Sequence, residues 1–325
     1  MPSLPPTVQV GYTLSSEEHP PRALIDNART AEAAGFDFVS ISDHYHPWID
    51  RQGHSPFAWA VIGGIAAVTE RIGVGTGVTC PTTRIHPAIA AQAAATAGCL
   101  LPGRFAFGVG TGEKLNEHIT GLRWPEYEVR ADQLAEAIEV IRALWTGAVT
   151  SHHGRHFTVE NARIHDVPDP LPPLVVAAGG PRSAGLAATA GDGLWMSSVS
   201  KETVEAWRAA GGSGPVYAQI DLCFAPTEEE GARTVAEIWP NGTVHGQVSQ
   251  ELPSPAHFAE LLASVTPEQA KGAMPCGPDV ARIAGEVRAA VDAGVTHVYL
   301  HQIGPDQASF LEMARTELLP GLRQA

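Results

Sequence analysis

The chain has 325 residues, 44% of them hydrophobic, and is long enough to bury one large core or two modest ones. Its formal net charge of −14 and its scarcity of lysine argue against a surface for nucleic acid or for an anionic membrane. No apolar run approaches the roughly 18 residues of a membrane span, and the first residues do not resemble a signal peptide. We therefore expect a cytoplasmic protein that acts on a small molecule.

The four cysteines give no sign of a metal or redox centre. Cys80, Cys99, Cys223 and Cys276 lack the paired spacing of zinc sites and thioredoxin-type motifs. A chain of this size does not depend on disulfides for its stability. We expect all four to be buried free thiols.

Strand-like and helix-like segments alternate along the chain. The first strand, 8–13, precedes a helix that ends at Gly35, a residue type common at helix C-termini. Apolar residues recur at helical spacing between Leu134 and Leu144 and indicate an amphipathic helix. The predicted strands span 8–13, 36–42, 71–79, 104–113, 174–181, 193–198, 216–225 and 297–304. Helical sequence is predicted at 21–34, 60–68, 87–101, 134–144, 202–210, 228–238, 280–293 and 308–319, with a further helix starting at Pro181.

Eight strand-helix repeats in one chain of this length predict an α/β protein with the (β/α)8, or TIM-barrel, fold in a single domain covering 1–325. Two segments interrupt the alternation. Residues 150–166 place a glycine between two β-rich stretches and indicate an excursion hairpin. Residues 239–276, between the seventh and eighth strands, exceed an ordinary connection, and we expect them to form a lid-like insertion.

The second predicted strand ends in a group of reactive side chains. Asp43, His44, His46 and Trp48 follow it within a few residues. Reactive residues of such barrels collect at the carboxyl ends of the strands, so we expect part of an active site here. The alternative is that Asp43 caps a helix and that the aromatic side chains only pack.

Later strands end in glycines and polar groups. The small residues at 75–81 would let a flat group approach the backbone. The glycines at 108–113 have neither P-loop nor Rossmann spacing, and Glu113 after them either faces a pocket or caps a helix. Gly179 precedes a helix start whose free N–H groups, with Arg182, predict a phosphate cradle.

Four motifs together carry a family resemblance. They are Ser42-Asp43-His44-x-x-Pro47-Trp48, Gly75-Thr76-Gly77-Val78, Gly108-Val109-Gly110-Thr111-Gly112-Glu113-x-x-Asn116-Glu117 and Ala177-Ala178-Gly179-Gly180-Pro181. In this order they resemble the luciferase-like barrel oxidoreductases that use the deazaflavin coenzyme F420. The resemblance is greatest to the F420-dependent glucose-6-phosphate dehydrogenase group.

The resemblance implies a role for each of four side chains. His44 would take the proton from a substrate alcohol or return it to a carbonyl, which suits an imidazole because it titrates near neutral pH. Glu113 would protonate the deazaflavin ring nitrogen as hydride arrives. Trp48 would stabilise developing charge at the reacting centre, and Asp43 would hold the cofactor and His44 in place.

The resemblance also implies a cofactor site without a metal and a homodimeric assembly. The resemblance implies that the Gly77-Val78 peptide bond is cis and lies behind the deazaflavin ring. Cys80 stands where we expect threonine in relatives. The implied cofactor-binding residues are Asp43, Gly77, Val78, Cys80, Thr111, Gly112, Glu113, Asn116, Ala177, Ala178, Gly179 and Gly180.

The insertion departs from the pattern of the sugar-phosphate enzymes, which hold the phosphate with lysines and an arginine. Here no lysine or arginine occurs between Arg233 and Lys271, and only Lys271 and Lys201 could fall near the phosphate. A dianionic phosphate wants several cationic or amide donors. We therefore expect an F420-dependent dehydrogenase or reductase whose substrate is an uncharged alcohol or carbonyl compound rather than glucose 6-phosphate.

Four alternatives remain open from the residues alone. The same barrel could bind FMN and act as a monooxygenase. Asp43, His44 and His46 could be ligands of a metal-dependent barrel hydrolase. The histidines of the hairpin at 150–166 could bind a metal. Finally, the barrel could be a binding module without catalysis.

Overall fold

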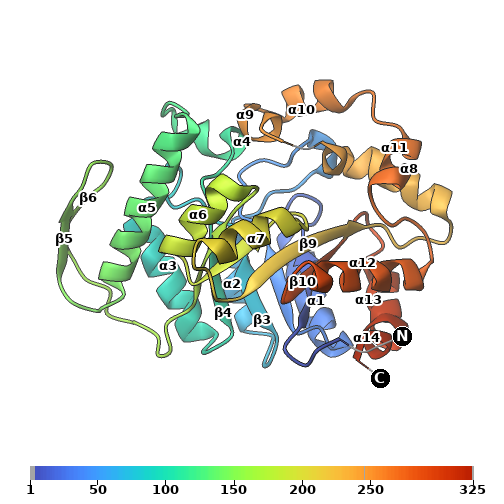
Figure 1. Cartoon of the computed structure of the whole chain (residues 1–325), viewed down its shortest axis with the longest axis horizontal. Helices are drawn as coiled ribbons and strands as arrows, with labels where there is room; N and C mark the ends of the chain where they lie inside the picture. The colour runs from blue at the N-terminus through green and yellow to red at the C-terminus, as the bar shows by residue number, and fades with distance from the viewer. Residues whose placement is uncertain (1–3, 245, 324–325) are drawn as a thin grey trace.

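The computed structural model describes residues 4–244 and 246–323, and its centre is a closed barrel of parallel strands (Figure 1). The strand β1 pairs with both β2 and β10, which closes the barrel. The barrel strands are β1 (Gln9–Leu14), β2 (Phe38–Ile41), β3 (Gly73–Thr76), β4 (Phe105–Val109), β7 (Leu174–Ala177), β8 (Gly193–Met196), β9 (Val216–Leu222) and β10 (His297–Gln302). The prediction of a (β/α)8 barrel is confirmed.

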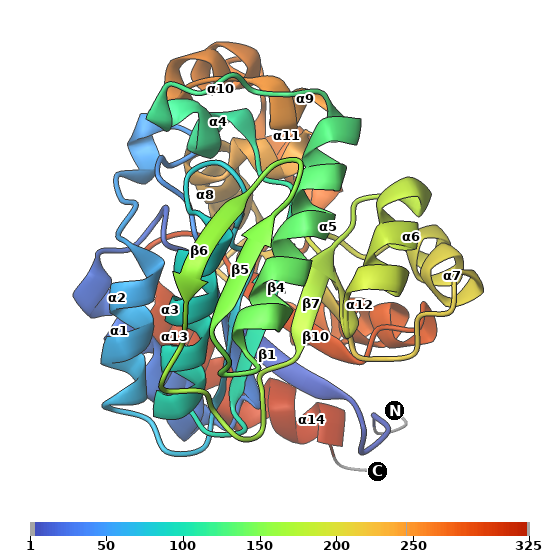
Figure 2. The same ribbon diagram turned by 90° about the vertical axis from the view of Figure 1, so that its left-hand side faces the viewer.

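Helices connect the strands and cover the outside of the barrel (Figure 2). The helix α1 starts with Pro21 and ends at Gly35, whose φ of 96° is left-handed, as its sequence predicted. The helices outside the insertion are α1 (Pro21–Ala34), α2 (Ala58–Ala66), α3 (Pro87–Leu100), α4 (Lys114–Glu117), α5 (Tyr127–Leu144), α6 (Pro181–Ala190), α7 (Lys201–Ala209), α8 (Glu228–Ile238), α12 (Val280–Asp292), α13 (Gln307–Met313) and α14 (Leu319–Arg323). Short 3-10 turns lie at η1 (Asp50–Gln52) and η2 (His118–Thr120), and a π-helical turn, η4 (Ala314–Leu318), joins the last two helices.

Aromatic side chains fill the barrel interior. The indole of Trp195 stacks on Tyr217 with ring centroids 4.4 Å apart and donates a hydrogen bond of 2.8 Å to the Tyr299 hydroxyl. That hydroxyl donates in turn to the Met196 carbonyl, and Phe38 packs edge-on against Tyr217. The barrel is therefore solid at this level, as in other barrels of this type, and any ligand must bind above these rings.

The two interruptions occupy different parts of the molecule. Strands β5 (Thr150–His153) and β6 (Thr158–Ala162) pair antiparallel in a hairpin beside α5 (Figure 2). The insertion contains η3 (Pro240–Thr243), α9 (Val248–Glu251), α10 (Pro255–Leu262) and α11 (Pro267–Ala273). Helices α9 and α10 lie beside α4 at one end of the barrel, and both termini lie towards the other end (Figure 1, Figure 2).

Several local predictions were wrong. Cys99 is exposed, whereas the other three cysteines are buried as free thiols. The helix predicted at 60–68 is α2, which ends at Ala66, and Val68 beyond its end is exposed. Most predicted strands extended too far at their carboxyl ends, since these extended segments leave the sheet to form the loops above the barrel.

Among the described residues, no helix is long and apolar enough to cross a membrane.

Candidate active site

A pocket of about 330 Å³ opens at the carboxyl end of the barrel, within the usual range for ligand sites of roughly 300–1,000 Å³. Its lining comes from the ends of the strands and from the insertion. One wall consists of small side chains and backbone, namely Gly77, Val78, Gly110, Ala177 and Ala178. We refer to these five residues as the small-residue wall.

The glycines of the small-residue wall cannot take a side chain without a clash, so this part of the wall stays free of side chains. A Cβ on Gly77 would lie 2.3 Å from Ser40 Oγ and 3.0 Å from the Trp195 ring. A Cβ on Gly110 would lie 2.8 Å from a methyl group of Val78. The Gly77-Val78 peptide bond is cis, as the resemblance implied. A planar ring system could therefore lie against this wall, so the residues present fit the implied deazaflavin.

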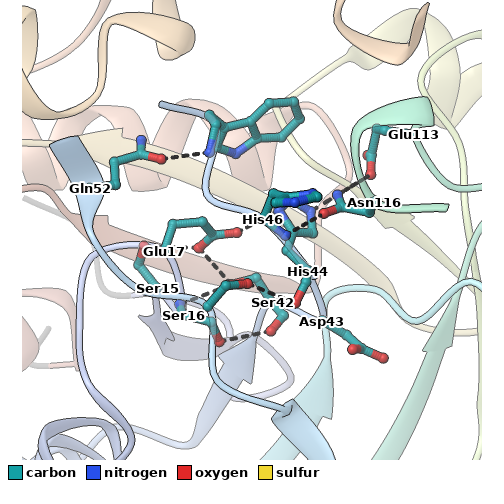
Figure 3. A network of polar contacts seen from close by, with 12 residues as sticks. Ser15, Ser16, Glu17, Ser42, Asp43, His44, His46, Gln52, Glu113 and Asn116 are labelled. Atoms are coloured by element: carbon teal, nitrogen blue, oxygen red, sulfur yellow. Dashed lines mark hydrogen bonds and ion pairs between the residues drawn. The ribbon is translucent and has the colours of Figure 1, made fainter. Parts of the chain in front are cut away.

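His44 stands between two carboxyl groups at the mouth of the pocket (Figure 3). Its Nδ1 lies 2.7 Å from Glu17 Oε1, close enough for an ion pair although the angle is outside that of a hydrogen bond. Its Nε2 lies 3.7 Å from Glu113 Oε2, which is beyond hydrogen-bond length. The Glu17 carboxyl also accepts hydrogen bonds from Ser15 and Ser42, so its position is fixed.

The electrostatics of this cluster keep His44 protonated. Burial alone would lower the pKa of the imidazole, but the Glu17 carboxylate, with a smaller contribution from Glu113, outweighs burial and raises the pKa to about 9. Burial likewise acts to raise the pKa of Glu17, and the attraction of His44 lowers it to about 2. At neutral pH the pair is an imidazolium beside a carboxylate.

Trp48 covers His44 and connects it to the insertion. The indole lies edge-on to the His44 ring at 5.1 Å and edge-on to Phe258 of α10 at the same centroid distance. Its backbone N–H donates to Gln52 Oε1 at 2.8 Å (Figure 3), and Gln52 donates in turn to the Ile238 carbonyl, at the end of α8. The loop that carries the imidazole is thus fixed to the segment that covers the pocket.

Asp43 lines the pocket, but its oxygens are occupied by protein groups. Oδ2 accepts a 2.6 Å hydrogen bond from Thr79, and Oδ1 lies 3.0 Å from the Arg84 guanidinium. Arg84 also contacts the buried carboxyl group of Glu117. Burial raises the pKa of Glu117 to about 7, because its effect exceeds the opposite effect of the Arg84 cation. Asp43 therefore positions the loop that carries His44.

The other residues implied for the cofactor divide into two groups. Cys80, Thr111, Gly112, Glu113 and Gly179 line the pocket together with the small-residue wall. Asn116 and Gly180 are not part of the described lining.

Asn116 is buried and acts on the His44 loop instead. Its Oδ1 accepts hydrogen bonds from the backbone N–H groups of Tyr45 and His46, and its amide lies 3.4 Å from Glu113 Oε2 (Figure 3). Gly180 is the N-cap residue of α6. Arg182, expected to help hold a phosphate there, forms an ion pair with Glu128 and lies over the Tyr127 ring.

Four important side chains were not predicted from the sequence. Glu17 and Glu18 follow the first strand, and the rule that reactive groups collect at strand ends would have identified them. Arg84 lies in the loop after β3, to which the same rule applies. His301 lies within β10, and its inward direction follows only from the strand register.

Apart from its histidines, the described pocket lining has carboxyl groups but no cationic side chain. Among the described lining residues there is neither lysine nor arginine. The two lysines considered for a phosphate are both engaged elsewhere: Lys271 contacts Glu228 at 2.7 Å, and the exposed Lys201 lies 3.8 Å from Glu205. The described insertion residues that line the pocket are all uncharged: Trp239, Asn241, Gly242, Val244, Ser249, Gln250 and Phe258.

Three of the histidines considered for metal binding have other partners. His46 Nδ1 lies 3.0 Å from the Leu115 carbonyl, His152 contacts Glu136, and His153 contacts Glu160. Within the described ranges, no group of three or more His, Cys, Asp or Glu side chains is arranged to hold a metal ion.

Comparison with known proteins agrees with this geometry. The family model described as "Luciferase-like monooxygenase" matches residues 4–297. The F420-dependent glucose-6-phosphate dehydrogenase of Nocardia farcinica is 36% identical over 97% of this chain and 98% of its own length. The corresponding enzyme of Beutenbergia cavernae is 37% identical with the same coverage.

Solved structures extend the comparison. An F420-dependent secondary alcohol dehydrogenase in complex with an F420-acetone adduct superposes with a TM-score of 0.90 at 29% identity, over 97% of this chain and 99% of that one. A coenzyme F420-dependent tetrahydromethanopterin reductase from Methanopyrus kandleri shares the fold, with a TM-score of 0.78 at 22% identity over 97% of this chain and 99% of that one. With a matching family model over most of its length, this chain belongs to the luciferase-like family.

Proposed function

We propose that this protein is an F420-dependent oxidoreductase that transfers a hydride between the coenzyme and an uncharged alcohol or carbonyl compound. The observation that carries the proposal is one pocket that has the small-residue wall, a protonated imidazole and no lysine or arginine among its described lining. The family and the F420-dependent relatives support the cofactor.

The residues that would hold the coenzyme are the small-residue wall, with Thr111, Gly112 and Gly179 at its margins. The start of α6 next to Gly179 offers backbone N–H groups to the anionic tail of the coenzyme. A Cβ on Gly179 would meet nothing within 4 Å, so a ligand has room to approach the backbone there. When bound, F420 supplies the carbon that accepts or donates the hydride.

The proton of the reaction is held at Nε2 of His44. With a pKa of about 9, the imidazolium can donate this proton to a carbonyl oxygen at neutral pH, which favours reduction. In alcohol oxidation the imidazole must first be neutral, so we expect oxidation to accelerate as the pH rises towards 9. Glu113 would hold the second exchangeable proton at its carboxyl group. Trp48 and Phe258 would exclude water from the reacting centre.

The substrate is inferred to be uncharged because of the electrostatics of the pocket. Glu17, Asp43, Glu113 and Asp221 supply carboxyl groups to the lining, so an anionic substrate would lose its hydration without gaining a lysine or arginine, and the imidazolium of His44 already has Glu17 as its partner. The enzymes of Nocardia and Beutenbergia are named for glucose 6-phosphate, and the F420-acetone structure is named for secondary alcohols. The distribution of charge favours the second kind of substrate here.

The test is a binding titration followed by an activity panel. Purified protein is titrated with F420, FMN and NADP, and reduction of F420 is then followed with 2-propanol, 2-butanol and glucose 6-phosphate. We expect F420 to bind most tightly and the secondary alcohols to react. Faster reduction with glucose 6-phosphate would overturn the substrate assignment. Preferential binding of FMN with oxygen consumption would instead identify a monooxygenase.

We also propose a homodimer, as the resemblance implies. Light scattering after size-exclusion chromatography should give twice the chain mass of 34.2 kDa. A mass of a single chain at micromolar concentration would contradict this assembly.

A further inference from the structure

A second imidazole lines the pocket, between two further carboxyl groups. The His301 side chain is 1% exposed; its Nε2 lies 2.7 Å from Glu18 Oε2 and its Nδ1 lies 2.9 Å from Asp221 Oδ1. Donation to both carboxylates requires both ring nitrogens to be protonated. Consistently, the two carboxylates outweigh the effect of burial and raise the pKa of His301 to about 10.

The strand register brings this cluster into one polar row with Thr13. His301 of β10 is paired with Asp221 of β9. Two residues earlier on the same face of each strand, Tyr299 is paired with Gln219. On β1, Gly11 is paired with Tyr299, so Thr13, two residues further along the same face, lies level with His301. Thr13, Gln219, Asp221 and His301 all line the pocket. We refer to these four residues as the polar wall.

Two groups of the polar wall can still bind a ligand. The Thr13 side chain is buried, and its hydroxyl has no hydrogen-bond partner among the residues that the structure describes. A buried hydroxyl without a partner is costly, which indicates a ligand or a bound water. Asp221 Oδ1 accepts from both His301 and Gln219, whereas no described residue donates to Oδ2.

The chemistry of the polar wall selects the group that it can hold. A carboxylate oxygen accepts, and the Thr13 hydroxyl both donates and accepts, so the matching ligand group is one that can donate and accept as well. A hydroxyl meets this requirement. A phosphate or carboxylate does not, because the Glu18–His301–Asp221 cluster carries a net negative charge with His301 protonated.

We propose that Thr13 and Asp221 form a second substrate subsite, which binds a further hydroxyl group of a neutral alcohol substrate. Glu18 and His301 are positioning residues that hold the Asp221 carboxylate towards the pocket. The inference rests on the proposed function and narrows it: the preferred substrates are diols or larger polyols without phosphate. The reacting hydroxyl lies at His44, and the second hydroxyl lies at the polar wall.

The test compares alcohols that differ by one hydroxyl group. Reduction of F420 is measured with 2-butanol and with 1,3-butanediol, for the wild type and for Thr13→Val and Asp221→Asn. Thr13→Val preserves shape and removes no hydrogen bond recorded within the described chain, so this variant should fold even if Asp221→Asn does not. The exposed Asp50, which is not in the pocket lining, provides the matched control Asp50→Asn.

We expect the ratio of kcat/KM for the diol to kcat/KM for the mono-alcohol to fall at least tenfold in Asp221→Asn and several-fold in Thr13→Val. An unchanged ratio in both variants would overturn the subsite. A loss of F420 affinity at an unchanged ratio would assign the polar wall to a hydroxyl of the coenzyme, and would also overturn the proposal.

A second readout does not depend on turnover. Ligand-observed NMR compares binding of 1,3-butanediol with binding of 2-butanol to the protein without added coenzyme. The diol should bind more strongly to the wild type than to Thr13→Val, and equal binding to both would contradict the subsite. If the wild type bound the diol selectively but reduced no F420 with any alcohol, the proposed function would fail and the subsite would stand.

Discussion

The two histidines of the described pocket lining, His44 and His301, resemble each other in charge and differ in access. Each is paired with one of two consecutive glutamates, Glu17 and Glu18, which diverge because β1 lies between β2 and β10. Both nitrogens of His301 are held by carboxylates within 3 Å, whereas Nε2 of His44 faces Glu113 across 3.7 Å. A raised pKa alone does not make a group an acid or base catalyst. The imidazole must also have a nitrogen open to the substrate.

The largest expected effect comes from replacing His44, whose Nε2 is open to the substrate. His44→Asn should lower kcat with 2-butanol by about 10²–10⁴-fold, the usual contribution of a positioned acid or base, while F420 affinity changes little. The measurement is steady-state reduction of F420, with binding followed separately. His153→Asn, on the exposed hairpin, is the matched control and should leave kcat unchanged. A kcat for His44→Asn within threefold of wild type would remove His44 from the proton-transfer step.

His301, whose two ring nitrogens are both held by carboxylates, should matter more for stability than for the chemical step. Replacing His301 with leucine leaves Glu18 and Asp221 facing each other without their cation, which costs about 3–5 kcal/mol for a broken buried pair. Urea unfolding monitored by circular dichroism measures this loss. A loss below about 1 kcal/mol would mean that the carboxyl groups are satisfied without the imidazole.

The pH dependence of this stability has a definite sign. The folded pKa of His301 is raised to about 10, so its stabilising contribution is fully present below the ordinary histidine pKa near 6.5 and disappears as the pH rises through about 10. The wild type should therefore lose stability in that alkaline range. His301→Leu should lack this component of the loss.

A smaller effect is expected when His44 loses the negative charge of Glu17. Glu17→Gln removes the strongest influence that raises the pKa of His44, so the pH at which alcohol oxidation is half-maximal should fall from about 9 by at least one unit. The profile of kcat against pH, measured with 2-butanol, gives this midpoint. An unchanged midpoint would show that another group controls the titration.

Much of the fold followed from the sequence because the repeat of strand and helix is strong. The helix 228–238 was predicted with its observed bounds as α8, and the cis bond at Gly77-Val78 followed from the resemblance. The helices of the insertion were not predicted. Their segment is rich in proline, glycine and serine, and they pack through scattered apolar contacts such as Phe258 with Trp48 rather than through a long periodic face.

The candidate site was predicted in part for a similar reason. His44, Trp48 and Glu113 stand in local motifs, and the structure brings them to one pocket. The rule for strand ends would also have identified Glu17, the partner of His44, but the His301 cluster joins Glu18 and His301 from opposite ends of the chain. No local pattern carries that information, because it arises only when β1 closes the barrel against β10. The roles assigned to these side chains remain proposals.

The central claim is direct hydride transfer from an uncharged secondary alcohol to F420 at the imidazole of His44. The most direct measurement is the reaction of 2-butanol carrying deuterium at C2 with oxidised F420, followed by mass spectrometry of the reduced coenzyme. The account predicts that one deuterium from the alcohol is found in the coenzyme, at a rate lowered at least a hundredfold in His44→Asn. Reduced coenzyme without deuterium, or no reduction by the alcohol under conditions in which glucose 6-phosphate reacts, would contradict it.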